Sequence, residues 1–333
     1  MRTKKPLTIV KIKKRNGGYR IIVPKPAGYN NIKAYKRTKK LLLSLYSKYR
    51  IKDVSYGFYP ETNGIKSSYK SNALRHANNR YILTMDIKDY FNHISFKMIE
   101  YACTSVYLQM KDILGEYDKG IMDDATKDVS DIRSCLSYYK ENITKYKNAK
   151  DIENIINSKR YNVNDEKKNY VICYQGLPLS PLIAQFAGIA IDRDVLLHIP
   201  DGITYSRYVD DLTFSSNNKE QLEGIVDKTK DILKQHGLML SENKTKFTDT
   251  TIKRAEITGL YVQGDGKVYC NRRYRRKVRA ALHNLKSLKS LYALLLKLGL
   301  DNFYLLCYIL LFKERLKYIG TINIWKQNHN RTA

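Results

Sequence analysis

Hydrophobic and polar residues alternate in several short stretches of this chain. Between residues 7 and 23, apolar and basic side chains alternate on both sides of Asn16-Gly17-Gly18. This pattern predicts a β-hairpin with a glycine-containing turn and a basic exposed face. Residues 81–85 form a short β-rich run that ends on Asp86. Residues 203–214 alternate in the same way and predict a second hairpin, whose turn carries Asp210-Asp211.

Other segments follow a helical period. Apolar residues recur at helical spacing in four segments: 31–49, 67–78, 182–197 and 220–236. Directly before the third segment, Ser180-Pro181 has the cap and first-turn signature of a helix start. Residues 104–170 are highly charged and lack Gly and Pro after Gly120, so they predict a helical insertion. Asp265-Gly266 predicts one more hairpin, and the pattern from 274 to about 318 is helical and basic.

Charge narrows the class of partner. The chain has 60 Lys and Arg residues against 32 Asp and Glu residues, a formal charge of +28. Such a surplus favours polyanionic partners through counterion release, and the 28 tyrosines can stack on bases among the cations. A membrane surface is the weaker alternative, because the charge is spread along the whole chain and not collected on one amphipathic helix. Nucleic acid is therefore the expected partner.

The remaining composition excludes several other classes. The five cysteines are far apart and have no metal-ligand spacing, so neither a zinc site nor a disulfide framework is expected. The N-terminus has no apolar segment of signal-peptide length, and charged residues interrupt the apolar stretch 291–312. We therefore expect a cytoplasmic protein with no membrane partner.

Three aspartates are the candidate chemical centre. Two-metal nucleotidyl transfer needs carboxylates that hold divalent ions about 3.5–4 Å apart, and Mg²⁺ prefers oxygen ligands. Asp86 ends one predicted strand, and Asp210-Asp211 lies in a predicted turn. Taken singly, each is more often an ordinary structural Asp, because Asp is common in turns.

The order of the surrounding motifs resembles that of reverse transcriptases. Five segments match the family's motifs in sequence: Asp86-Ile87-Lys88-Asp89-Tyr90-Phe91, Gln175-Gly176-Leu177-Pro178-Leu179-Ser180-Pro181, Tyr208-Val209-Asp210-Asp211, 237–245, and 257–260 with 265–268. Asn72-Ala73-Leu74-Arg75-His76 and Ile257-Thr258-Gly259 are similar to two motifs of retron reverse transcriptases. The resemblance covers residues 10–317.

The resemblance implies an α+β fold of the right-hand polymerase type, with fingers, a palm with a small antiparallel sheet and a helical thumb. The expected divisions are fingers and the start of the palm at 1–85, first metal motif of the palm at 86–102, charged helical insertion at 103–170, palm at 171–269, and helical thumb with a short tail at 270–333.

The resemblance also implies roles for residues around the aspartates. Asp86 and Asp210 would bridge two Mg²⁺ ions, or Mn²⁺ ions as the alternative, with help from Asp211 and the Ile87 carbonyl. Lys244 would donate a proton to the leaving pyrophosphate, although a lone lysine is most often a solvated charge. Phe91 would exclude a ribose 2′-hydroxyl, and a core phenylalanine is the alternative.

Further residues are expected to bind nucleotide or nucleic acid. Lys14 and Arg20 would reach the triphosphate, and spacing leaves open whether Lys13 is the contact instead. Gln175 and Gly176 would let the backbone approach the nascent base pair. Asn72 and His76 share one helix face and form either an RNA-contacting site or a structural pair. The basic run would follow the primer–template backbone: Arg272, Arg273, Tyr274, Arg275, Arg276, Lys277 and Arg279.

The expected activity is RNA-directed DNA synthesis on a cognate structured noncoding RNA, as in retrons, which are associated with anti-phage defence and an effector protein. The expected partners are therefore this RNA as template and primer, the DNA product and dNTPs. One alternative is a defence-associated reverse transcriptase that makes untemplated or repetitive DNA. Another is an idle RNA-binding scaffold, against which the three intact aspartates argue. The short C-terminal tail leads us to expect no ribonuclease H domain.

Overall fold

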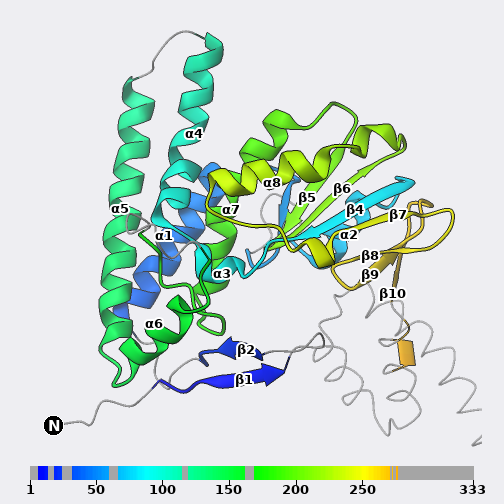
Figure 1. The fold of residues 1–333 in the computed structure, drawn as a ribbon. Coiled ribbons are helices and arrows are strands. Elements are labelled where there is room, and N and C mark those ends of the chain that lie inside the picture. The colour runs from blue at the N-terminus through cyan, green and yellow to red at the C-terminus, as the bar shows by residue number, and fades with distance from the viewer. Residues whose placement is uncertain are drawn as a thin grey trace, which may run out of the picture. The chain divides into compact units, whose positions relative to one another are not determined.

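The computed structural model describes residues 7–13, 19–24, 32–59, 67–114, 119–161, 169–270, 272 and 275–276. The chain divides into two compact units, Met1–Tyr269 and Cys270–Ala333. Nearly all of the described residues belong to the first unit, and the fold described below is that of this unit (Figure 1). None of the helices in the described ranges is long and apolar enough to cross a membrane.

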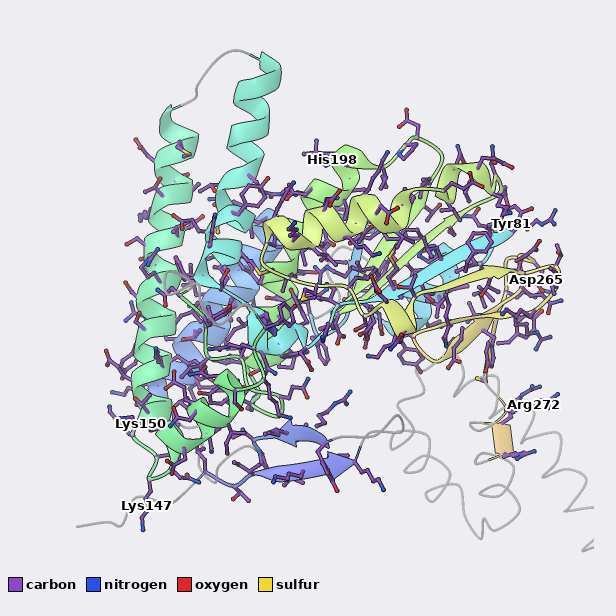
Figure 2. The ribbon with its side chains drawn as sticks, in the orientation of Figure 1. Tyr81, Lys147, Lys150, His198, Asp265 and Arg272 are labelled. Atoms are coloured by element: carbon purple, nitrogen blue, oxygen red, sulfur yellow. The ribbon has the colours of Figure 1, made fainter. Side chains whose placement is uncertain are left out.

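A five-stranded sheet lies at the centre of the first unit. Its strand order is β3-β5-β6-β4-β7, with bounds Ser55–Tyr56, Thr204–Tyr208, Asp211–Ser216, Tyr81–Asp86 and Lys246–Asp249. All pairs are antiparallel except β3 with β5, which is parallel. The expected antiparallel sheet is therefore present, and it has one parallel pair at its edge, where β3 lies beside β5. Tyr81 marks the end of β4 opposite to Asp86 (Figure 2).

The two faces of the sheet carry different side chains, because successive residues of a strand point to opposite faces. Tyr205 and Arg207 of β5 point to the face covered by α7 (Ser180–His198), where both contact Asp192. Ser206 points to the other face and bonds to residues of α2 (Tyr69–Arg75) and its C-cap. The sheet is thus held between two helices.

Helices α1, α4, α5 and α6 lie together beside the sheet (Figure 1). Their bounds are Lys33–Tyr49, Phe96–Leu114, Lys119–Thr144 and Ala149–Asn157. The remaining helices are α3, Tyr90–His93, and α8, Ile225–Gln235, which packs on α7. Apart from Pro181, every residue of α7 from Ser180 to Val195 is buried. The helix packs on α1, α4 and α8, as expected for a helix that is mostly apolar. Within the range expected as a charged insertion, 103–170, the described residues include most of α4 and all of α5 and α6.

One predicted helix is broken. The segment 220–236 begins as a 3-10 turn, Glu220–Leu222, and α8 starts only after Gly224, which has a φ of 74°. A glycine in this left-handed conformation ends one helical segment and lets the chain change direction before the next. The prediction of one continuous helix over 220–236 was therefore wrong at Gly224.

Two smaller sheets complete the described fold. Strands β1 (Val10–Lys13) and β2 (Tyr19–Ile22) pair antiparallel, which confirms the first predicted hairpin, although its turn lies outside the described residues. The second sheet has the order β10-β9-β8, with bounds Val268–Cys270, Leu260–Val262 and Ala255–Ile257. The hairpin predicted at Asp265-Gly266 is therefore present as β9 and β10.

Candidate active site

The three aspartates meet where β4 ends and β6 begins, at neighbouring inner strands of the central sheet. Asp86 ends β4 and Asp211 begins β6, and the register pairs these two residues directly. Side chains of directly paired residues lie on the same face, about 4.5–5.5 Å apart at Cβ. Asp210 precedes Asp211, and its carbonyl accepts a hydrogen bond of 2.9 Å from the Ile87 amide, which ties the turn to the end of β4. The sheet register therefore gathers the carboxylates.

The turn between β5 and β6 is tighter than predicted. Tyr208 pairs with Asp211, so only Val209 and Asp210 lie in the turn, and Asp211 belongs to the strand. Val209 has a φ of 62°, which a two-residue hairpin turn requires at its first position but which is strained for a β-branched residue. Its side chain is buried, and this packing helps to hold the conformation that presents Asp210.

A buried arginine supports this turn through a hydrogen bond to its backbone. Arg207 is fully buried and donates to both carboxylate oxygens of Asp192, at 2.8 and 2.7 Å. It also donates to the Gln185 side chain and, at 3.0 Å, to the Val209 carbonyl. The guanidinium thus anchors the backbone next to Asp210. Gly188 leaves room for it, because a Cβ there would lie 2.2 Å from the Arg207 Cζ.

Burial and mutual repulsion raise the pKa values of two of the carboxyls. The pKa of Asp210 is raised to about 6, mainly by burial and then by the charge of Asp86. The pKa of Asp211 is raised to about 7 by burial and then by Asp210 and Asp86. Carboxylates crowded in this way are stabilised as anions by a nearby cation.

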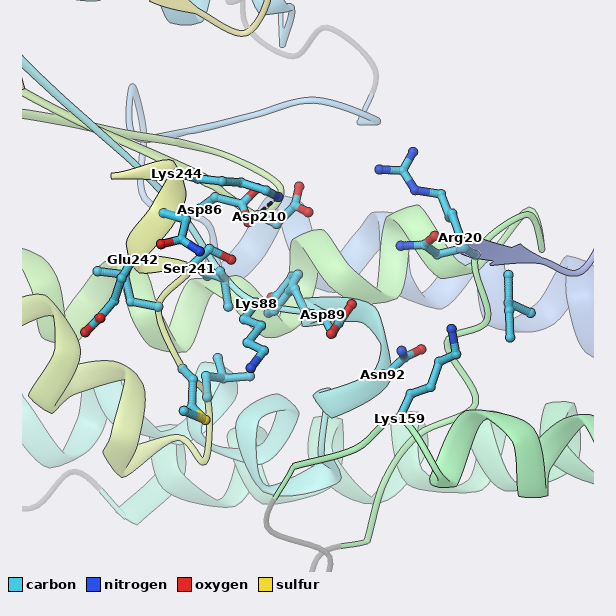
Figure 3. A pocket seen from close by; sticks show the side chains of 18 of the residues that line it. Arg20, Asp86, Lys88, Asp89, Asn92, Lys159, Asp210, Ser241, Glu242 and Lys244 are labelled. Atoms are coloured by element: carbon cyan, nitrogen blue, oxygen red, sulfur yellow. Dashed lines mark hydrogen bonds and ion pairs between the residues drawn. The ribbon is translucent and has the colours of Figure 1, made fainter. Parts of the chain in front are cut away.

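An open cavity of about 1490 Å³ lies in front of Asp86 and Asp210. Among the described residues, seven basic ones line it: Lys13, Arg20, Lys88, Lys159, Lys230, Lys234 and Lys244. Four acidic residues also line it: Asp86, Asp89, Asp210 and Glu242. Figure 3 shows Arg20 and Lys159 across the cavity from the carboxylates. A surplus of cations around a carboxylate centre suits a ligand that has phosphates.

Lys244 lies directly at the centre. It belongs to the short 3-10 turn Glu242–Lys244, and its Nζ lies 2.7 Å from Asp86 Oδ2 (Figure 3). The segment before it runs beside the end of β4, where the Ser241 amide donates to the Asp86 carbonyl and the Lys88 amide donates to the Met239 carbonyl. The ammonium is therefore close enough to form an ion pair with, or to donate a proton to, a ligand bound at Asp86.

The loop at Gln175-Gly176 contacts the basic hairpin. The Gln175 carbonyl accepts a hydrogen bond of 2.7 Å from the Val23 amide. Gly176 has a φ of 100°, and a Cβ there would lie 2.6 Å from the Ile22 side chain and 2.7 Å from the Val23 carbonyl. Glycine is thus required here by the close approach of the protein's own backbone. Gln175 lines the cavity, and its contact with a base pair remains a prediction.

Other predicted residues lie at varied distances from the cavity. Ile87 and Arg20 line it, whereas Phe91 is half-buried, packs on the Tyr90 ring, and is absent from the lining residues of the described chain. The core alternative for Phe91 is thus compatible with its position. Lys13 lines the cavity, and Lys14 lies outside the described residues.

Asn72 and His76 lie beneath the sheet and not at the surface. Both are fully buried. His76 bonds to the Ser206 and Ser215 hydroxyls at 2.7 Å each, and the Ser206 hydroxyl donates to the Asn72 side chain. Burial, and then the charge of Arg75, lowers the pKa of His76 to about 3. These contacts favour the structural pair over direct contact with RNA.

The basic run at 272–279 belongs to the second unit. Within it, Arg273, Tyr274, Lys277 and Arg279 lie outside the described residues. The structure describes Arg272, Arg275 and Arg276 as helical. Their role in nucleic-acid binding therefore stays a prediction.

The donor set fits a hard divalent cation. In the described ranges, no group of three or more His, Cys, Asp or Glu side chains is arranged as a complete metal cluster. Mg²⁺ does not need one, since it is usually held by one or two carboxylates together with substrate phosphates and water. Asp86, Asp210 and Asp211 offer only oxygen donors, and burial, followed by the neighbouring carboxylates, raises the pKa values of Asp210 and Asp211.

Sequence reasoning missed the residues that support the site. Arg207, Asp192 and Gln185 were not singled out, although all three lie in segments that were expected to be a strand or a helix of the core. Charged residues of opposite sign in two such segments are the signal that could have found the pair. The cavity residues Lys88 and Lys159 were missed because nothing local separates them from other lysines.

Comparisons with known proteins agree with this geometry. Residues 12–255 match the family "Reverse transcriptase (RNA-dependent DNA polymerase)". The Retron Ec73 reverse transcriptase of Escherichia coli is 27% identical over 85% of this chain and 77% of its own length. The Retron Mx65 reverse transcriptase of Myxococcus xanthus is 26% identical over 82% of this chain and 54% of its own length.

Among solved structures, apo telomerase from Candida tropicalis is 14% identical with a TM-score of 0.46, and the match covers 80% of this chain and 49% of that chain. The expected α+β polymerase fold is confirmed by the family match and by the mixed helices and sheet of the first unit. The chain belongs to the reverse transcriptase family, the RNA-dependent DNA polymerases, and is of the retron type.

Proposed function

We propose that this chain copies a cognate structured noncoding RNA into DNA, using two Mg²⁺ ions at Asp86, Asp210 and Asp211. The observation that carries the proposal is the register that pairs Asp86 with Asp211 beside a basic cavity. When bound, the ions would stabilise negative charge on the attacking and leaving oxygens. Ile87 would complete the metal site through its carbonyl.

The protein's own residues would bind and orient the substrates. Arg20 lies across the cavity from the carboxylates (Figure 3), where a guanidinium can bind a triphosphate through paired hydrogen bonds. Lys244 Nζ would donate a proton to the leaving pyrophosphate. Arg207 would keep the Val209-Asp210 backbone in place through its bond to the Val209 carbonyl.

The test uses the purified full chain with the RNA encoded beside its gene, Mg²⁺ and dNTPs. We expect DNA synthesis, and we expect Asp210→Asn to abolish it. Asp201→Asn is the matched control, because Asp201 is an exposed acid in a turn before β5. Equal product from Asp210→Asn and the unmodified chain would refute the assignment of the site.

Sequencing of the product separates the proposed reaction from its rival. A unique complementary copy of the noncoding RNA supports templated synthesis, whereas repeats or sequences without a template would support the other defence-associated activity. We also propose a part in anti-phage defence with an effector protein, on the basis of the retron relatives. A plaque assay with Asp210→Asn in the native host tests this role, and unchanged protection would refute it.

A further inference from the structure

Phe58 is a large aromatic residue held at the surface. It follows β3, and its side chain is 50% exposed, whereas its neighbours Tyr56 and Tyr59 are buried. Phe58 has a φ of 61°, and the Tyr59 amide donates a hydrogen bond of 2.8 Å to the Gly57 carbonyl across it. A bond between residues i and i+2 around a positive φ is a rare and strained γ-turn. The chain thus turns a phenylalanine outward against its own conformational preference.

This ring lies beside a row of paired residues that includes two of the aspartates and is here called the catalytic row. The register pairs Tyr56 with Tyr208, Tyr208 with Asp211, and Asp211 with Asp86 across neighbouring strands. The Phe58 ring lies 6.3 Å from the Tyr208 ring, at an angle of 43°. Gly57 allows this approach, since a Cβ there would lie only 3.1 Å from the Tyr208 ring.

Phe58 is also separate from the cavity in front of the carboxylates. Neither Phe58 nor Tyr208 is among the described residues that line the cavity, although Asp86 and Asp210 are. A ligand on the Phe58 ring would therefore contact described residues other than those that line the cavity. In a polymerase that has one substrate with a triphosphate and one nucleic-acid substrate, the aromatic side suits the nucleic acid, because every base has a face that can stack.

We propose that Phe58 is a nucleic-acid-binding residue, whose ring stacks on a nucleotide of the primer–template duplex beside the catalytic row. The inference rests on the proposed function for the identity of the duplex. Strain at a surface aromatic is a feature of binding sites, where the conformation is kept for contact and not for stability. The alternative is that Phe58 merely packs on Tyr208 and stabilises the turn.

Binding of a fluorescent RNA–DNA hybrid, measured without dNTPs, tests the proposal. If the ring stacks on one base, Phe58→Ala should weaken binding of the hybrid about 5- to 150-fold, and Phe58→Trp should retain binding. The slope of affinity against salt should stay unchanged, because no charge is removed. Tyr138→Ala is the matched control, since Tyr138 is a 40% exposed aromatic on α5.

Phe58→Gly separates the two roles. Glycine adopts a positive φ without strain, so this variant should bind the hybrid as weakly as Phe58→Ala and unfold at an equal or higher temperature than the unmodified chain. A lower unfolding temperature with unchanged binding would overturn the proposal and leave Phe58 as a packing residue. Binding equal to the unmodified chain in Phe58→Ala would overturn it as well.

The outcome is distinguishable from failure of the proposed function. If the unmodified chain binds the hybrid but incorporates no dNTP, the polymerase proposal fails while the variants still report on Phe58. If the chain synthesises DNA and Phe58→Ala raises the KM for dNTP without weakening the binding of the hybrid, the ring contributes to dNTP binding in the cavity and the inference is wrong.

Discussion

Replacement of Arg207 by Met should destabilise the protein and displace the catalytic turn. The guanidinium is fully buried, and its partner Asp192 has a side-chain exposure of 1%. Burial lowers the pKa of Arg207 and the charge of Asp192 raises it, with a net upward direction. The arginine is therefore charged at all accessible pH values. Arg207→Met would leave the Asp192 carboxylate buried without a cation and the Val209 carbonyl without this donor.

The magnitude follows from these contacts. Removal of one partner from a buried ion pair costs about 3–5 kcal/mol, and the loss of the hydrogen bond to Val209 adds about 1 kcal/mol. A domain of this size loses about 2–4 °C of unfolding temperature for each kcal/mol. We therefore expect Arg207→Met to unfold roughly 8–24 °C earlier.

Urea denaturation of a double-mutant cycle is the decisive assay. Asp192→Asn alone should also be strongly destabilising, because it leaves Arg207 as the uncompensated charge. Combination of Asp192→Asn with Arg207→Met removes both charges, so the double variant should lose about 3 kcal/mol less than the sum of the single losses. If the two losses simply add, or if Arg207→Met costs under about 1 kcal/mol, the ion pair does not support the turn.

Three further predictions concern other contacts. Gly176→Ala should lower the free energy of unfolding by about 1–3 kcal/mol in urea titrations, because its Cβ would overlap Val23 and its φ is positive; unchanged stability would contradict this. His76 has a pKa lowered to about 3 in the folded protein, so only the unfolded chain takes up a proton there as the pH falls below about 6.5. The free energy of unfolding should therefore drop by about 2 kcal/mol at pH 5. Urea titrations at several pH values should show that His76→Gln removes this contribution to the pH dependence of stability. Lys244→Met should lower kcat about 100-fold or more in steady-state assays with little effect on hybrid binding, if its ammonium is the proton donor; an unchanged kcat would exclude that role.

The sequence predicted the parts of the site that are local in the chain. Asp86 was recognised because it ends a short β-rich run, and Asp210 because it lies between two alternating segments. The exact place of Asp211, in the strand and not in the turn, depends on the register with Tyr208. Alternation alone does not determine which pair closes a hairpin.

The contacts that support the site were not predictable from the same patterns. Arg207 and Asp192 meet only because α7 packs on one face of the sheet, and no local pattern reports such a contact between distant elements. The strained φ of Phe58 is likewise a product of tertiary context, since nothing in the identity of a phenylalanine indicates a left-handed conformation.

The position of β4 in the sheet has a consequence for the order in which the protein forms. Strand β4 lies between β6 and β7, and β6 begins 125 residues after β4 ends. At ribosomal rates of 5–20 residues per second, β4 waits about 6–25 s for its first partner. Helix α5 packs on both α1 and α4, all within residues 33–144, and these contacts need no later segment. These three helices can therefore assemble early in synthesis, whereas the catalytic centre exists only after the ribosome has passed residue 211.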